Sequence, residues 1–273
     1  MRKSLGGALT ILLGLLVPPA ASAEVFPTGD VFRPLIADPT EPRFFLSLLS
    51  LDSRDERFSV ASIGAGLNFG VYRWPGERPG EGWQVGLFGT VFSQFNLDSP
   101  SDELINSDFR IGVPLSYKRG DWSARASVFH QSSHLGDELI LSGSAPQRIN
   151  LSIEALDFVL AWERGGWRPY VGGFYLLGGE PEGLDKSGLH AGLDYASRKP
   201  LLWGARLVAG LDWKWFHETG AGTSAKVGLE FGRPRPERRG ITVLLEAYDG
   251  FAPFGQFYRD EVTYYGAAVQ FDF

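Results

Sequence analysis

The sequence contains no cysteine, which excludes disulfide bonds and thiolate metal sites. Positive charge is also scarce, because 26 Lys and Arg stand against 32 Asp and Glu and give a formal net charge of −6. This balance excludes the basic surface that is typical of nucleic-acid-binding proteins. After residue 23 no apolar stretch approaches the roughly 20 residues that a transmembrane helix needs.

The first 23 residues have the pattern of a secretory signal peptide. Arg2 and Lys3 supply a positive start, residues 8–17 form a short apolar run, and Ala21-Ser22-Ala23 resembles a small-residue cleavage site. The mature chain is therefore expected to begin near Glu24. Its remaining length of about 250 residues is enough for one large domain.

The abundant residues are glycine, with 35 copies, and aromatics, which make up 14 % of the chain. The mean hydropathy is nevertheless close to zero, at −0.08. Transmembrane β-barrels have this composition because lipid-facing apolar residues alternate with polar residues that face the lumen. The composition therefore favours such a barrel.

Alternation with a period of two residues recurs along the whole mature chain. In residues 202–215, odd positions such as Leu207 and Leu211 are apolar, whereas even positions such as Arg206 and Asp212 are polar or glycine. Similar segments predict an all-β fold, an antiparallel transmembrane β-barrel of about twelve strands of the Gram-negative outer-membrane type. The expected strands are 43–52, 57–73, 82–96, 107–118, 121–133, 149–163, 167–178, 187–197, 201–216, 222–232, 239–248 and 262–273.

The connections predict how the barrel is oriented. An even number of strands places both ends of the barrel on one side of the membrane, and segments 97–106, 134–148, 179–186 and 249–261 then form long outer loops. Six tryptophans fall at expected periplasmic strand ends, as in an aromatic belt. The terminal Phe273 resembles the signal that the barrel assembly machinery recognises, which would make that machinery a partner.

Residues 24–42 do not fit the strand pattern. Pro34 and Pro39 rule out a central strand here, because proline lacks the backbone N–H that a sheet needs. We expect a periplasmic or lumenal arm that precedes a barrel of residues 43–273. A plain linker is the alternative.

Two segments resemble a bacterial family catalogued as domain of unknown function 1207. They are residues 31–39, which read Val-Phe-Arg-Pro-Leu-Ile-Ala-Asp-Pro and are followed by Pro42-Arg43-Phe44, and residues 129–138, which read Phe-His-Gln-Ser-Ser-His-Leu-Gly-Asp-Glu. The resemblance extends over most of the mature chain. It implies a location in the cell envelope and no particular activity.

One group of residues has the composition of a catalytic site. His130 and Ser132 continue the lipid-facing set that begins at Trp122. If Trp122 lies beside Trp162 on the next strand, His130 faces Glu154 across the strand pair, at a Cβ separation of roughly 4.5–5.5 Å. Ser132 as nucleophile, His130 as base and Glu154 as the group that orients the imidazole would form a hydrolytic triad.

This arrangement resembles outer-membrane phospholipase A and the lipid A deacylase, in which a His-x-Ser pair on the lipid-facing wall is completed from the neighbouring strand. The resemblance implies a lipid acyl-ester hydrolase that acts on outer-membrane lipids, with Asn150 as an alternative third member. Calcium is implied if the site is phospholipase-like, with Asp137 and Glu138 as candidate ligands. The alternative interpretation is that His130 and Ser132 only contact lipid headgroups.

Charges of both signs point into the predicted lumen. The inward-facing set is Arg110, Arg125, Asp157, Asp194, Arg206, Asp212, Lys214, Lys226, Glu230 and Glu246. His190 is expected to join this polar network. A lumen filled by salt bridges favours a second functional hypothesis, a non-catalytic structural envelope barrel or a narrow channel.

Overall fold

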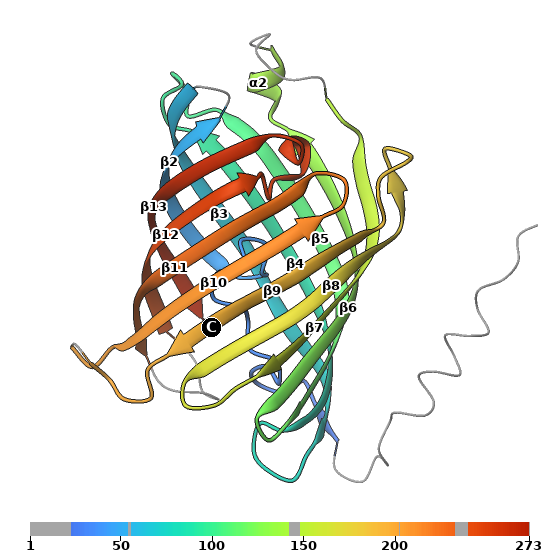
Figure 1. Ribbon diagram of the computed structural model, residues 1–273, viewed down its shortest axis with the longest axis vertical. Coiled ribbons are helices and arrows are strands. Elements are labelled where there is room, and N and C mark those ends of the chain that lie inside the picture. The colour runs from blue at the N-terminus through green and yellow to red at the C-terminus, as the bar shows by residue number, and fades with distance from the viewer. Residues whose placement is uncertain (1–22, 54–55, 142–147, 202, 233–239, 273) are drawn as a thin grey trace, which may run out of the picture.

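The computed structural model describes residues 23–53, 56–141, 148–201, 203–232 and 240–272, which form an antiparallel β-barrel (Figure 1). Residues 1–22 of the predicted signal peptide and Phe273 lie outside the described residues. The elements are β1 (Glu24–Val25), β2 (Phe44–Ser53), β3 (Glu56–Pro75), β4 (Gly82–Asn96), β5 (Leu104–Arg119), β6 (Trp122–Leu135), α2 (Asp137–Leu141), β7 (Leu151–Trp162), β8 (Trp167–Glu180), β9 (Ser187–Ala196), β10 (Arg206–Phe216), β11 (Gly220–Gly232), β12 (Gly240–Phe251), η1 (Gly255–Phe257) and β13 (Glu261–Asp272).

The strands β2 to β13 close into a ring. Each strand pairs with its sequence neighbours, and β13 pairs with β2, so that Phe271 lies opposite Phe44. Closure gives every wall strand two hydrogen-bonded neighbours, which satisfies the backbone without water. The prediction of a twelve-stranded antiparallel barrel is confirmed. Within the described ranges, no helix has the length and apolar character needed to cross a bilayer.

The period-two pattern separates an apolar outer face from a polar lumen. On the outside, Ile111 and Leu245 are 63 % and 65 % exposed. On the inside, Asp212 and Lys226 are 2 % and 6 % exposed. A belt of exposed aliphatic side chains around a closed sheet is the surface that a lipid bilayer covers.

The two ends of the barrel differ in their connections. The loop rim, at the top of Figure 1, carries the segments 97–103, 136–150, 181–186 and 252–260. The C-terminal rim, where β13 ends, has the short turns 120–121 and 163–166. Trp122, Trp162 and Trp167 lie at strand ends on the C-terminal rim, as predicted. The C-terminal rim also carries the longer connections 76–81 and 197–205, so the expected difference in loop length is present only in part.

One strand begins later in the structure than the sequence predicts. Residues 201–216 were expected to form a single strand, but β10 starts at Arg206. Trp203 and Gly204 have φ angles of 50° and 77°, in the left-handed region, and this conformation interrupts an extended backbone. Trp203 therefore lies in a turn, where it is 85 % exposed.

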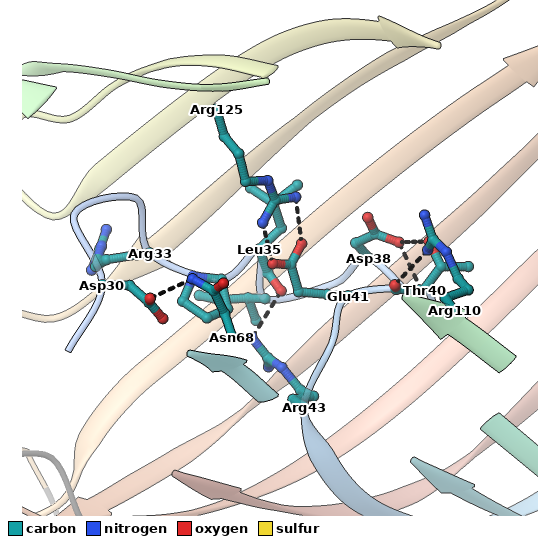
Figure 2. Close-up of polar contacts among 12 residues, drawn as sticks. Asp30, Arg33, Leu35, Asp38, Thr40, Glu41, Arg43, Asn68, Arg110 and Arg125 are labelled. Atoms are coloured by element: carbon teal, nitrogen blue, oxygen red, sulfur yellow. Dashed lines mark hydrogen bonds and ion pairs between the residues drawn. The ribbon is translucent and has the colours of Figure 1, made fainter. Parts of the chain in front are cut away.

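Residues 30–43 run through the inside of the barrel, and we call them the arm (Figure 2). Phe32 and Leu35 of the arm are buried against Val159, Ala161 and Tyr170 of the wall. Burial of side chains of this size contributes about 1.5–3 kcal/mol each. The arm is therefore a packed part of the structure that fills the middle of the lumen.

Most of the inward wall charges are paired with each other or with the arm, although among the described residues Arg110 and Asp157 form no ion pair. Within the wall, Arg168 pairs with Asp194, Arg206 with Glu230, and Lys226 with Glu246. Between wall and arm, Arg125 pairs with Glu41 and Lys214 with Asp38. The predicted salt bridges inside the lumen are present, and the arm supplies two of their carboxylates.

Candidate active site on the outer wall

The neighbouring strands β6 and β7 position the predicted triad. Trp122 lies opposite Trp162, and this register continues to His130 opposite Glu154 and Ser132 opposite Ser152. The predicted register is confirmed. Because neighbouring side chains alternate between faces, His130 and Ser132 lie on the same outer face as Val128.

The histidine and the glutamate are hydrogen-bonded to each other. Nδ1 of His130 lies 3.0 Å from Oε1 of Glu154, a distance at which a protonated Nδ1 donates to the carboxylate. This bond fixes the tautomer that leaves Nε2 as a proton acceptor. Ser132 is two residues along the strand on the same face, so its Cβ lies about 6.6 Å from that of His130. The imidazole, the carboxylate and the hydroxyl therefore share one patch on the outer face.

The patch lies at the upper edge of the apolar wall. Val128 and Leu156, which are opposite each other one step below it, are half exposed and begin the aliphatic surface. On the β5 side, Phe109 lies opposite Ser132 and Ile111 lies opposite His130. The side chains of His130 and Glu154 themselves are 43 % and 53 % exposed. The patch is thus accessible from outside the barrel, with apolar surface below and beside it.

The other predicted site residues lie near the patch but are not part of the hydrogen-bonded pair. Asn150 donates its side-chain amide to Glu180 on β8. Asp137 and Glu138 form the first turn of α2 at the loop rim, where Oε2 of Glu138 accepts a hydrogen bond from Ser101 at 3.1 Å. Among the described residues, Asp137 and Glu138 belong to no group of three close metal-binding side chains. A calcium site there stays a prediction.

A comparison with known protein families finds a match over almost the whole chain. Residues 18–273 match the family described as Protein of unknown function (DUF1207). The chain belongs to this family. The resemblance seen at residues 31–39 and 129–138 is therefore confirmed. No curated protein matches the chain.

Solved structures of outer-membrane phospholipase A share the fold of this DUF1207 protein. The Escherichia coli enzyme is 17 % identical, with 89 % of this chain and 95 % of that chain covered and a TM-score of 0.57. The Salmonella typhi enzyme, a dimer with bound calcium, is 16 % identical, with coverages of 86 % and 94 % and a TM-score of 0.58. An active-site mutant of the E. coli enzyme is 18 % identical, with coverages of 88 % and 93 % and a TM-score of 0.57. At these identities the likeness shows the fold alone.

The DUF1207 barrel has a second polar cluster, inside the lumen, that sequence reasoning did not find. Ligand atoms of Asp38, His190 and Asp212 lie within 4.8 Å of one another. Tyr170 donates its hydroxyl to Asp212 at 2.6 Å, and His190 also contacts Asp212. Alternation places His190 and Asp212 inward, but no local signal places Asp38 of the arm beside them.

A lysine supplies the positive charge of this lumenal cluster. Nζ of Lys214 lies 2.6 Å from Oδ1 of Asp38 and 2.7 Å from Oγ1 of Thr40. Burial raises the pKa of Asp38, but the nearby Lys214 and His190 lower it by more than burial raises it. The pKa of Asp38 therefore lies well below its usual value. Asp38 is therefore a carboxylate, and its charge is balanced by an ammonium group.

The outer-wall register predicts a specific cross-link. In the cysteine-free chain, Ser132→Cys combined with Ser152→Cys should form a disulfide on mild oxidation, because the two residues are directly opposed on one face. The matched control, Ser132→Cys with Ile153→Cys, should not cross-link because Ile153 lines the lumen. Each oxidised variant is digested, and electrophoresis of the peptides without and with reductant shows whether the two cysteines are linked. Equal cross-linking of both pairs would contradict the register.

Proposed function

We propose that this protein is an integral β-barrel of the Gram-negative outer membrane that hydrolyses acyl esters of membrane lipids at Ser132. The observation that carries the proposal is the hydrogen bond between His130 and Glu154, 3.0 Å long, beside a serine on the same outer face. A base whose tautomer is fixed by a carboxylate, next to a hydroxyl, is the arrangement that activates a serine nucleophile.

The chemistry assigns one task to each side chain. Nε2 of His130 accepts the proton of the Ser132 hydroxyl as Oγ forms a bond to the ester carbonyl carbon. When the tetrahedral intermediate collapses, the bond to the alcohol oxygen breaks and His130 returns the proton to that oxygen. Water then hydrolyses the acyl-serine by the same steps. Glu154 stabilises the imidazolium that forms in each step.

The depth of the patch supports a lipid substrate. Ester groups of membrane lipids lie between the hydrocarbon and the headgroups, and the patch lies where the aliphatic surface of β6 and β7 gives way to polar residues. Acyl chains would rest against Phe109, Ile111 and Val128, which are exposed on the outer face. Such a substrate reaches Ser132 by lateral movement in the bilayer.

The outer-membrane location is supported by the architecture. The fold is that of outer-membrane barrels, and its longest connection, which carries α2, lies at the loop rim. In bacterial barrels the long loops face the outside, which would place the patch in the outer leaflet. Phospholipids and lipid A are the acyl esters of that leaflet, so both belong in the test.

Ser132→Ala is expected to abolish lipid hydrolysis because it removes the attacking oxygen. The matched control is Ser50→Ala, which removes another outward-facing serine, on β2. Wild type and Ser50→Ala, expressed in the outer membrane, should both raise lysophospholipid or deacylated lipid A in mass spectra, and Ser132→Ala should not. Identical lipid profiles for all three proteins, together with no ester hydrolysis by purified wild type, would refute the proposed activity.

Substitutions at the third position test how the imidazole is oriented. Glu154→Ala should lower kcat by about 10²- to 10⁴-fold with little change in KM, because the tautomer of His130 is no longer fixed. Glu180→Ala, which removes a carboxylate on the neighbouring strand, should stay within a few-fold of wild type. A loss of kcat in Asn150→Ala and not in Glu154→Ala would instead assign the third position to Asn150.

A further inference from the structure

Among the cavities that the described residues line in the lumen, two lie on either side of the arm. The larger cavity, of about 250 Å³, extends from Tyr258 near the loop rim to Asp38 and Glu41 of the arm. The smaller one, of about 50 Å³, is lined by Asp272 at the C-terminal rim and by Ile36 of the arm. Pro34 borders both cavities. A passage along the barrel axis is therefore interrupted at the level of the arm.

The wall side chains that contact the arm at this level are mainly cations. Among the described residues, positions 34–41 of the arm make polar contacts with four wall cations, Arg110, Arg125, Arg168 and Lys214, and with one wall carboxylate, Asp194. The carboxylate is already paired with Arg168. Asp157 and Asp212 of the wall also line the larger cavity, but among the described residues neither pairs with Arg125 or Lys214, whose ion-pair partners come from the arm.

Two carboxylates of the arm form these ion pairs. Both oxygens of Glu41 accept hydrogen bonds from Arg125, and Asp38 accepts one from Lys214 (Figure 2 shows the Arg125 pair). Arg110 donates to the backbone carbonyl of Thr40 at 2.9 Å and has no carboxylate within ion-pair distance among the described residues. If the arm left its place, three cations of the wall would face the lumen with their main partners removed.

The wall is also shaped to receive the arm. Gly210 on β10 faces Ile36 and Ala37, and a Cβ at position 210 would lie 2.9 Å from Cβ of Ile36 and 3.0 Å from Cβ of Ala37. Real Cβ atoms do not approach so closely, so the arm fits only because this residue is glycine. Charge and shape thus both match the arm to one place in the lumen.

We infer that the arm is a plug that closes an anion-selective passage through the barrel, and that Asp38 and Glu41 hold it in place. When the arm moves aside, the two cavities join, and Arg110, Arg125 and Lys214 line the constriction. Small inorganic anions are then attracted and cations repelled. This activity is separate from lipid hydrolysis, because it belongs to the inner face of the wall.

The test is conductance of the purified mature barrel in planar bilayers with a KCl gradient. Wild type should be closed most of the time. Asp38→Asn with Glu41→Gln should raise the open fraction at least about tenfold, because both charge pairs that hold the arm are lost. The reversal potential should show preference for chloride. Arg125→Gln with Lys214→Gln also releases the arm, but the preference for chloride should fall or vanish.

A change of shape gives a counterpart that leaves the charges in place. Gly210→Ala adds a Cβ where Ile36 and Ala37 of the arm lie, so it should also raise the open fraction, with the preference for chloride retained. Heat-dependent gel mobility verifies that each variant is folded. A folded Asp38→Asn, Glu41→Gln barrel that is as silent as wild type would overturn the inference, as would a preference for potassium.

Discussion

The structure depends on one constraint, the need of the backbone for hydrogen-bond partners in a medium that offers none. A sheet meets this need in lipid only by closing on itself, which β13 does by pairing with β2. Closure then forces alternate side chains outward and inward along every strand. The aliphatic belt, the salt bridges of the lumen and the positions of both polar clusters all follow from that alternation.

The same constraint gives the two faces separate chemistry. On the outer face, polar side chains are stable only at the edge of the apolar belt, and His130, Ser132 and Glu154 occupy that edge. On the inner face, charges are stable only when paired, and the wall alone does not pair them all. The arm supplies Asp38 and Glu41 to Lys214 and Arg125, so the packing of residues 30–43 is tied to the electrostatics of the wall. The proposed site for membrane lipids and the proposed plug of the lumen therefore lie on opposite faces of one sheet.

The sequence predicts the features that repeat and misses those that depend on contacts distant in the chain. Period-two alternation identifies the twelve strands and their faces, and two facing tryptophans are enough to set the register of His130 and Glu154. The start of β10 could not be predicted, because the positive φ angles at Trp203 and Gly204 have no signal in an alternating segment. The cluster of Asp38, His190 and Asp212 was missed because it joins the arm to two strands that are far away in the sequence. The hydrogen bond from Ile36 to Asp194 spans a similar separation, 158 residues.

The most direct test of the account is a scan of spin-label accessibility along residues 124–133 of β6 in lipid bilayers. Labels at even positions, including 130 and 132, are predicted to collide with oxygen dissolved in the hydrocarbon. Labels at odd positions point into the barrel, away from the lipid, and should collide with this oxygen much less. The two sets should alternate residue by residue. A scan without that period, or one in which positions 130 and 132 follow the lumenal set, would contradict both the barrel faces and the outer-wall site.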